Sequence, residues 1–442
     1  MTNIIIETSK YLMILLIACY TFFNFRFFAF SDRERKRVMC ARQNQAMFMI
    51  HLLAYLIIYL KTRDIKILIF YLAQIVFFLS YIYLYRLFYR NVSRLLVNNA
   101  CMLMCIGLIV LTRISLERAV RQFVLLAASA LITWIVPFIM EHAWQLSRGA
   151  WLYAGLGLVL LGVVCITGNT TFGAQLSLEI AGISVQPSEF VKISFVFFTA
   201  SMFYRSTSFL SVAAATAVAA AHVLILVLSK DLGSALLFFA TYLFMLFVAT
   251  SKWLYLFGGW LSGAAAALLA YLVFPHVQTR VAAWSDPWSD IDRTGYQIAQ
   301  SLFAIGTGGW FGMGLCQGMP YKIPVVEKDF IFAAISEELG GIFALCVLFI
   351  CIGCFLQFMM IAGTMQAVFY KLIAFGLGVV YILQIFLTVG GVTKFIPSTG
   401  ITLPFVSYGG SSILSTFLLF NIIQGLYILK RNEEDEEEHE ES

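Results

Sequence analysis

Residues 232–250 read LGSALLFFATYLFMLFVAT, a run without a single charged side chain. A helix of about 20 mostly apolar residues is long enough to cross the hydrocarbon core of a membrane. Twelve further apolar runs follow this pattern, at roughly 10–30, 45–60, 66–88, 98–113, 119–140, 150–167, 189–204, 207–228, 253–274, 330–361, 368–389 and 402–429. The sequence therefore predicts an all-α polytopic membrane protein with thirteen spanning helices.

The composition indicates that lipid is the main solvent of this chain. Of its 442 residues, 61% are hydrophobic and 12% are charged, whereas soluble domains carry about 25% charged residues. No stretch alternates polar and apolar residues for long enough to build a soluble domain. We expect one membrane domain with a short tail, with membrane lipids and no nucleic acid among its partners.

The charges are divided unevenly along the chain. Residues 433–441 read EEDEEEHEE, whereas the remainder is basic and the net charge is +5. A basic membrane body suits anionic headgroups or a phosphate-bearing lipid substrate, and the ordinary basic flanks of cytoplasmic loops explain most of it as well. Residues 431–442 are predicted to form a disordered cytoplasmic tail that binds basic partners or keeps this end soluble.

Basic residues set the orientation of the helices, because cytoplasmic loops collect Lys and Arg. The first loop is placed inside because it holds Arg26, Arg33, Arg35, Lys36, Arg37 and Arg42. Counting spans alternately from there places the loops 168–188, 229–231, 275–329 and 390–401 on the outer face. The basic segment 113–121 also falls outside, against the rule.

The longest outer loop, residues 275–329, far exceeds the usual connection of about 4–6 residues, and such loops are usually functional. Its acids Asp286, Asp290 and Asp292 lack the Gly and closing Glu of an EF-hand loop, which favours solvated charges over a cation site. The glycines between 306 and 314 are followed by no GK[ST] sequence. They favour turns near a substrate over a phosphate cradle.

Asp329 stands where this loop re-enters the membrane, so it is expected to be the N-cap of the next helix, a general base at the mouth of a cavity, or both. Glu337 and Glu338 follow on the same predicted helix, about 12 and 14 Å deeper at 1.5 Å per residue. Acids inside a membrane are costly unless they are paired or face water. They are therefore either a buried pair with Lys or backbone, or part of a site.

Two shorter outer segments also gather polar residues. Gln186-Pro-Ser188-Glu189 precedes Lys192 by three residues, and this spacing favours an ion pair on one helix face. A structural latch is preferred over a functional role for that pair. Lys230 and Asp231 place charges at a second outer helix mouth.

The last outer segment, residues 394–412, contains Lys394, two prolines, a glycine pair, Ser407 and Ser411. Prolines and glycines inside an apolar region imply a broken helix that lines a cavity. The histidines form no HExxH pair and no G-x-S-x-G elbow occurs, which disfavours a His-metal or Ser-hydrolase site.

Over about residues 100–430 these segments resemble the SEDS family of membrane proteins, which includes RodA, FtsW and SpoVE. The motifs that carry the resemblance occur in the family's order. They are Gln186-Pro-Ser188-Glu189 with Lys192, Asp231-Leu-Gly233, Gly295-Tyr296-Gln297 with Gln300-Ser301, Ala304-Ile-Gly306, Asp329-Phe-Ile-Phe-Ala333, Glu337-Glu338-Leu-Gly340 and Pro404-Phe-Val-Ser407-Tyr-Gly-Gly-Ser411-Ser412.

The resemblance implies a ten-helix core in residues 98–430, preceded by about three extra transmembrane helices in residues 1–97. It implies that the chain polymerises lipid II into glycan strands at the outer face of a bacterial cytoplasmic membrane, for elongation, division or sporulation. It also implies a class B penicillin-binding protein as partner. The family's proposed catalytic aspartate falls on Asp329, and its functional pair falls on Glu189 and Lys192.

The sequence departs from the family pattern in several places. Residues 325–328 read VVEK where Glu-x-His-Thr is usual, and Lys230 stands where Pro usually precedes Asp-Leu-Gly. Leu176-Ser177 replaces the usual Arg-Trp. With the extra helices, these departures concern subfamily and partner choice more than the reaction type.

The hypothesis for the reaction is that Asp329 takes a proton from a sugar 4-hydroxyl of the acceptor lipid II, which attacks C1 of the donor strand with inversion. Lys192, Lys230, Arg280 or Lys394 is expected to bind the leaving pyrophosphate, and a divalent cation, Mg or Mn, is a candidate cofactor. The alternatives are a transporter (flippase) of lipid-linked precursors and another polyprenyl-linked glycan polymerase. The long outer loop and the lack of an internal repeat argue against a transporter.

Overall fold

The computed structural model describes residues 2–142, 144–171, 174–180 and 183–440. By their contacts the residues fall into two compact units. Unit 1 is Met1–Ala128, Ala282–Leu356 and Thr388–Gly409, and unit 2 is Ser129–Val281, Gln357–Leu387 and Gly410–Ser442.

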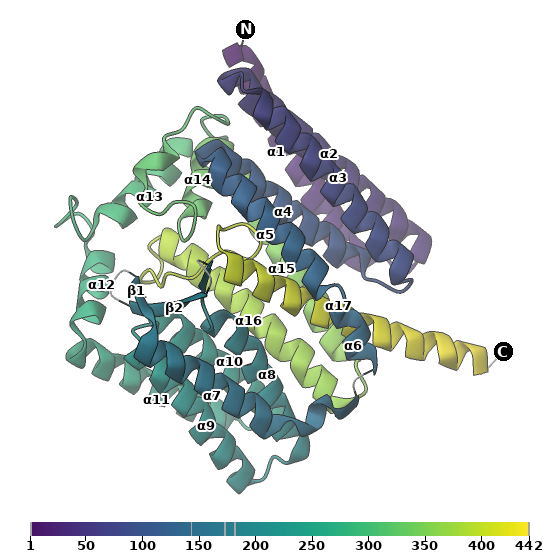
Figure 1. The fold of residues 1–442 in the computed structure, drawn as a ribbon, viewed down its shortest axis with the longest axis vertical. Helices are drawn as coiled ribbons and strands as arrows, with labels where there is room; N and C mark the ends of the chain where they lie inside the picture. The colour runs from purple at the N-terminus through teal and green to yellow at the C-terminus, as the bar shows by residue number, and fades with distance from the viewer. Residues whose placement is uncertain (1, 143, 172–173, 181–182, 441–442) are drawn as a thin grey trace. The chain divides into compact units, whose positions relative to one another are not determined.

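Unit 1 holds the N-terminal helices and most of the long loop region, and it shares several helices with unit 2. Figure 1 labels the helices and strands. Its helices are α1 (Thr2–Arg26), η1 (Phe27–Ala29), α2 (Arg33–Thr62), α3 (Ile65–Phe88), α4 (Arg94–Ile114), α13 (Tyr296–Gly308), η3 (Pro320–Lys322) and α14 (Ile331–Leu339). The helices that take part in both units are α5 (Leu116–Thr133), α12 (Pro275–Ser285), α15 (Gly341–Thr364) and α16 (Val368–Val392).

Unit 2 holds the remaining elements. They are α6 (Val136–His142), η2 (Trp144–Arg148), α7 (Ala150–Thr167), β1 (Asn169–Thr171), β2 (Ala174–Ile180), β3 (Ile183–Val185), α8 (Ser188–Arg205), α9 (Phe209–Leu228), α10 (Leu232–Thr250), α11 (Trp253–Val273) and α17 (Gly410–Glu440). The three short strands form one antiparallel sheet in the order β1-β2-β3, inside the predicted outer loop 168–188.

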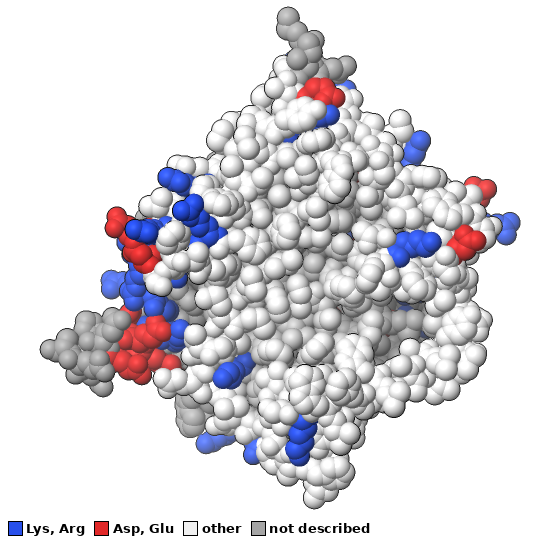
Figure 2. Space-filling view, turned by 180° about the vertical axis from the view of Figure 1, so that it is seen from behind, with Lys and Arg blue, Asp and Glu red and all other residues white. Residues whose placement is uncertain are grey.

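The predicted all-α membrane class is confirmed. Among the described residues, 12 helices are long and apolar enough to cross a membrane. The predicted span 189–204 corresponds to α8, which is not one of the twelve and carries Glu189, Lys192 and Arg205. Most of the surface in Figure 2 carries no charged side chain, as a surface in contact with lipid requires.

Helix α4 forms the centre of unit 1. Its most hydrophobic window is entirely buried, and α2 packs along it (Figure 1). Gly107 makes the closest approach, because a Cβ there would lie 2.7 Å from the Val406 carbonyl oxygen. The segment around Val406 is thereby seated against α4.

The predicted single helix over 330–361 is wrong, because the chain breaks at Gly340 into α14 and α15. Gly340 has a φ of +94°, and a Cβ there would lie 2.5 Å from the amide nitrogen of Gly312. Only glycine fits this conformation and this approach. Glu337 and Glu338 therefore lie in the last turn of a short helix rather than within a long one.

Two further expectations at the C-terminal end need correction. The predicted helix 402–429 begins only at Gly410, since Pro404 and the positive φ of Phe405 (61°) interrupt it. The acidic tail, predicted to be disordered from residue 431, continues α17 as helix to Glu440. Glutamate is a good helix former, and Glu434 pairs with Lys430 at 2.9 Å and with Arg431 at 2.5 Å.

Candidate active site

Asp329 lies in unit 1, in the turn that leads into α14, and is half-buried. The N-cap position of α14 is occupied by Phe330, one residue later. The expected N-cap placement of Asp329 is therefore wrong by one residue. This leaves Asp329 at the end of the irregular segment, before the helix begins.

The segment 403–409 holds the turn around Asp329 in place. The Ser407 hydroxyl donates to the Lys328 carbonyl at 2.5 Å, and the Tyr408 amide donates to the Glu327 carbonyl at 2.7 Å. Gln122 on α5 donates to the Ser407 carbonyl at 2.9 Å and accepts from the Gly409 amide at 3.2 Å. The backbone on the N-terminal side of Asp329 is thus fixed by the predicted motif.

Gly400 faces Asp329 directly. Its φ is +78°, and a Cβ built there would lie 3.8 Å from the Asp329 Oδ2 atom. The loop between α16 and α17 therefore passes over the carboxylate, with glycine at the point of approach.

The basic segment 113–121, which contradicted the predicted orientation, is neutralised by acids. Arg118 pairs with Glu327, two residues before Asp329. Arg113 pairs with Glu338 at 3.0 Å, and Arg121 pairs with Glu117 at 2.6 Å. Each arginine of the segment 113–121 thus has a carboxylate partner, and two of these pairs, Arg113 with Glu338 and Arg118 with Glu327, join the segment to the region around Asp329.

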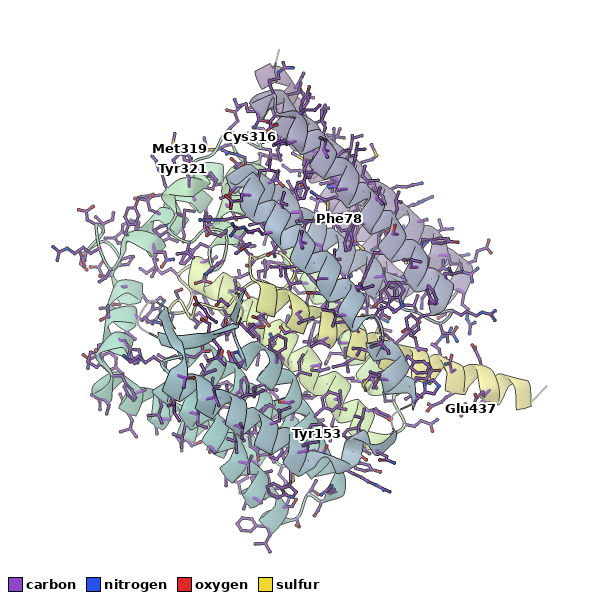
Figure 3. All side chains as sticks on the ribbon, viewed as in Figure 1. Phe78, Tyr153, Cys316, Met319, Tyr321 and Glu437 are labelled. Atoms are coloured by element: carbon purple, nitrogen blue, oxygen red, sulfur yellow. The ribbon has the colours of Figure 1, made fainter. Side chains whose placement is uncertain are left out.

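Glu337 and Glu338 hold the preceding loop rather than a cavity. Glu338 accepts from the amides of Cys316 and Gly318 at 3.2 and 3.1 Å, besides the guanidinium of Arg113. Glu337 accepts from the Met319 amide at 2.9 Å. Burial raises the pKa of Glu338, and Arg113 opposes that rise. The two glutamates are therefore positioning residues for the segment 313–319, on which Figure 3 labels Cys316 and Met319.

Helix α13 supplies the other predicted residues of unit 1. Gln297 donates to the Pro324 carbonyl at 3.1 Å, and Ser301 donates to the Val392 carbonyl at 2.7 Å. Tyr296 and Gln300 lie half-buried on the same helix. The Lys394 carbonyl accepts from the indole nitrogen of Trp284 at 3.1 Å, so α12 and α13 both contact the loop region around Asp329 and Lys394.

The predicted polar residues of unit 2 form one network. The Lys192 ammonium is 3.0 Å or less from two partners, Glu189 at 2.6 Å and Gln384 on α16 at 2.9 Å. Glu189 also accepts from the Ser415 hydroxyl on α17 at 2.7 Å. The side chain of Lys192 is 3% exposed and that of Glu189 is 13% exposed. The predicted ion pair is confirmed as a buried pair that joins α8, α16 and α17.

The residues just before α8 extend this network. The Gln186 amide donates to the Ser411 hydroxyl at 3.0 Å, and its side chain donates to the Ser188 hydroxyl at 3.2 Å. Ser188 in turn donates to Asp231 at 3.3 Å. Asp231 is the N-cap of α10 and accepts from the Ser234 amide at 3.1 Å. Burial raises the pKa of Asp231.

Lys230, His276 and Arg280 form a basic group in unit 2. The pKa of His276 is lowered by partial burial and by the positive charges of Arg280 and Lys230. His276 and Arg280 stand one turn apart on α12, and Lys230 has a φ of 63° in the turn before α10. No ion pair with an acid is found for these side chains within the described residues. A bound anion would relieve their mutual repulsion.

Sequence reasoning missed four partners: Arg113, Gln122, Gln384 and Ser415. Gln122, Gln384 and Ser415 lie within helices and are buried. A polar residue inside an apolar span is a site candidate by default, so this signal was available. The sequence contains no signal for which partner each residue contacts, because those partners are distant along the chain.

No side-chain cage for a metal ion is present in the described part of the chain, since no group of three His, Cys, Asp or Glu side chains gathers there. The acids Asp286 and Asp290 instead accept hydrogen bonds from Trp288 and Thr294 within their own turns. The described residues therefore offer no cage made of protein ligands alone, and a divalent cation here would need oxygen ligands from a phosphate-bearing substrate.

Comparison with known proteins matches residues 93–432 to the family described as "Cell cycle protein", FtsW/RodA/SpoVE. Peptidoglycan glycosyltransferase RodA of Mycobacterium tuberculosis is 37% identical over 315 residues, covering 65% of this chain and 66% of the relative. The probable peptidoglycan glycosyltransferase FtsW of Aeromonas salmonicida is 31% identical over 344 residues, covering 73% of this chain and 86% of the relative. The chain thus spans just under two thirds of the RodA relatives.

Solved structures show the same fold. A chain from a study entitled "Structural coordination of polymerization and crosslinking by a peptidoglycan synthase complex" matches with a TM-score of 0.67 at 22% identity, over 77% of this chain and 98% of that one. Thermus thermophilus RodA matches with a TM-score of 0.57 at 21% identity, over 76% and 96%. With the family match covering most of its length, this chain belongs to the FtsW/RodA/SpoVE family.

Proposed function

We propose that this chain is a glycosyltransferase that polymerises lipid II into peptidoglycan strands. The observation that carries the proposal is the Asp329 turn, whose flanking backbone is held by Ser407 and Tyr408, in a segment that Gln122 fixes in turn. This arrangement occurs in a chain whose relatives are named peptidoglycan glycosyltransferases. A carboxylate on a fixed backbone at the start of a helix is suited to act as a general base.

In the proposed reaction the Asp329 carboxylate takes the proton of the 4-hydroxyl of the acceptor lipid II. The bond from that oxygen to C1 of the donor strand forms as the bond from C1 to the pyrophosphate oxygen breaks. The electron pair leaves with undecaprenyl pyrophosphate, and the configuration at C1 inverts. This single displacement uses one base and one leaving group, so no covalent enzyme intermediate is needed.

The backbone contacts of the turn support the role of Asp329 as a general base, because they hold its carboxylate in a fixed position. Holding a base in a reactive geometry is worth several kcal/mol, and a displacement of about 1 Å costs about a hundredfold in rate. Gly400 leaves space beside the Asp329 Oδ2 atom that a side chain would fill. An acceptor hydroxyl needs that space.

Among the four basic residues expected from the sequence to bind the pyrophosphate, Lys230 and Arg280 are the candidates within unit 2 besides Lys192. Lys192 is buried and already paired with Glu189. Lys230 and Arg280 instead sit in a group of like charge that includes His276. A doubly charged anion bound there would be stabilised by these charges.

Replacing Lys230 or Arg280 with Ala is expected to raise the KM for lipid II about three- to tenfold for each change, because one exposed charge contact is worth about 1 kcal/mol. Steady-state rates with labelled lipid II measure the effect. Lys252→Ala, at the other end of α10, is the matched control and is expected to leave KM unchanged. Equal effects of Lys230→Ala and Lys252→Ala would contradict the assignment.

The proposal places the site at the outer face of a bacterial cytoplasmic membrane, with a class B penicillin-binding protein as partner. The ion pairs Arg113–Glu338 and Arg118–Glu327 place the segment 113–121 beside the loop that carries Asp329, and the span count from the first basic loop puts both on the outer face. The fold match to a chain of a peptidoglycan synthase complex supports the partner. Co-purification of the native complex from cells tests both the partner and the pathway it serves.

The function is tested with the purified chain in lipid vesicles that contain fluorescent lipid II. The proposal predicts glycan polymer that is longer than the disaccharide. Movement of lipid II between leaflets without any polymer would overturn it and favour the rival transporter. Competition by other polyprenyl-linked sugars then separates a lipid II polymerase from a polymerase of a different glycan.

A further inference from the structure

Helices α1, α2 and α3 lie before the family match, which starts at residue 93. They are not a loosely attached anchor. Side chains of α1 contact the loop 309–319, α4 and α15, all within unit 1. Figure 1 shows α1 at the N-terminal end of the ribbon, and Figure 3 labels Cys316 and Met319 of that loop.

The N-terminal end of α1 contacts residues 311–314 at three points. The Lys10 ammonium donates to the Gly312 carbonyl at 3.4 Å. The rings of Tyr11 and Phe311 have centroids 5.7 Å apart. Ile6 packs on Gly314, where a Cβ would lie 2.9 Å from its Cγ2 atom. A polar contact, a ring contact and an apolar contact thus meet the same four residues.

The other half of α1 is fixed in register by polar contacts. Asn24 donates to the Phe349 carbonyl on α15 at 3.5 Å and accepts from Asn99 on α4 at 2.8 Å. Asn99 also accepts from the Tyr20 hydroxyl at 3.0 Å. In an apolar medium a one-residue slip of α1 would leave these groups without partners, at a cost of about 1–3 kcal/mol each. The position of Lys10 relative to α4 and α15 is therefore set.

The loop that α1 contacts is joined to α14 by backbone hydrogen bonds. The amides of Met313 and Gly314 donate to the carbonyls of Glu337 and Glu338, both at 2.9 Å. On the other side of the break, the Gly341 amide donates to the Gly309 carbonyl at 2.9 Å. A shift of residues 311–314 must therefore move α14, and the turn that precedes α14 carries Asp329.

Helices α2 and α3 contact the same region through α4. Tyr55 on α2 is hydrogen-bonded to Thr112 on α4 at 2.8 Å, and Gln74 on α3 donates to Tyr55 at 2.5 Å. The residue after Thr112 is Arg113, which holds Glu338 and donates to the Gly318 carbonyl at 3.2 Å. Helix α1 thus contacts one end of the segment 311–319 directly, and α2 and α3 are linked to its other end through Thr112 and Arg113 of α4.

We propose that the N-terminal helices position the catalytic turn, with Lys10 of α1 as the positioning residue that acts on Asp329 through Gly312 and α14. The expected change in kcat rests on the proposed function. The expected change in the structure of residues 309–319 rests only on the contacts described above. Lys10 is suited to a clean test. Its partner Glu7 has a side chain that is 59% exposed, so removing the ammonium leaves no buried charge unpaired.

The test compares Lys10→Met with Gln43→Leu in the full chain. Gln43 is fully buried on α2 and accepts from Asn98 on α4 at 3.2 Å, without contact to the loop 309–319. Lys10→Met is expected to lower kcat for lipid II about tenfold with KM unchanged, and Lys10→Arg is expected to restore most of it. Gln43→Leu is expected to lower thermal stability and leave kcat within about twofold of the wild type.

Hydrogen–deuterium exchange of the amides 309–319 gives a readout that needs no activity. Faster exchange there in Lys10→Met, and not in Gln43→Leu, supports the positioning role even if the wild type makes no glycan, in which case only the proposed function fails. Unchanged exchange and unchanged kcat in Lys10→Met, with an active wild type, overturn the inference. Equal loss of kcat in both variants also overturns it, because the effect would then be general destabilisation.

Discussion

Replacing Glu189 with Gln is expected to destabilise the fold by about 3–5 kcal/mol, because it leaves the Lys192 ammonium buried without its counter-charge. Lys192 is 3% exposed, and its remaining partner in the network is the neutral Gln384. Ser415 loses a charged acceptor at the same time. Denaturation of the purified chain by titration with a denaturing detergent, followed by circular dichroism, measures the change.

The double variant Glu189→Gln with Lys192→Met is the matched control. Since it leaves no charge without a partner, it is expected to recover at least half of the lost stability. This result identifies the unpaired charge, rather than the lost shape of the side chain, as the cause. A double variant as unstable as Glu189→Gln alone contradicts that explanation.

Replacing Asp329 with Asn is expected to lower the rate of glycan formation by about 10²–10⁴-fold, the usual contribution of a general base. Asn keeps the size of the side chain and its place beside Gly400 but does not take a proton. The bonds from Ser407 and Tyr408 to the neighbouring backbone do not involve the carboxylate, and circular dichroism of the purified variant checks that it is folded. Polymerisation of labelled lipid II at saturating concentration measures the rate.

Asp292→Asn provides the control for that change. Asp292 lies exposed in the same predicted loop, so the substitution makes the same chemical change away from the turn. It is expected to leave the rate unaltered. A wild-type rate in folded Asp329→Asn protein would remove Asp329 from the catalytic role.

The helices and several site contacts were predictable because they depend on local patterns. Apolar runs of the length of a bilayer predicted the spans, and the spacing of Glu189 and Lys192 predicted their ion pair. The resemblance grouped the motifs, and the family match over residues 93–432 confirms it. The extra helices before residue 98 were also expected from the apolar runs alone.

The breaks in helices were less predictable, because they depend on close approaches between distant segments. Gly340 interrupts an apolar run that is predicted to be one helix. The break occurs there because the backbone of Gly312 lies too close for any side chain at residue 340. The acidic tail was misjudged because composition was weighed above helix propensity and local ion pairs. Net charge alone does not decide whether a short segment that follows a stable helix continues it.

The roles of Glu337 and Glu338 needed the structure for a similar reason. Sequence placed two acids inside a membrane helix and left a buried pair and a catalytic site both open. The carboxylates of Glu337 and Glu338 accept from the amides of Cys316, Gly318 and Met319. No sequence pattern connects those three residues to the two glutamates.

The central claim is that Asp329 activates an acceptor hydroxyl for a single displacement at C1, and the linkage of the product tests it most directly. Glycan made by the purified chain is digested with a muramidase that cleaves only β-1,4 bonds, and the fragments are measured by mass spectrometry. The account predicts complete digestion, because one displacement inverts the α-configuration of the donor pyrophosphate bond. Polymer with retained α-linkages would contradict it, since retention requires two displacements and a covalent intermediate.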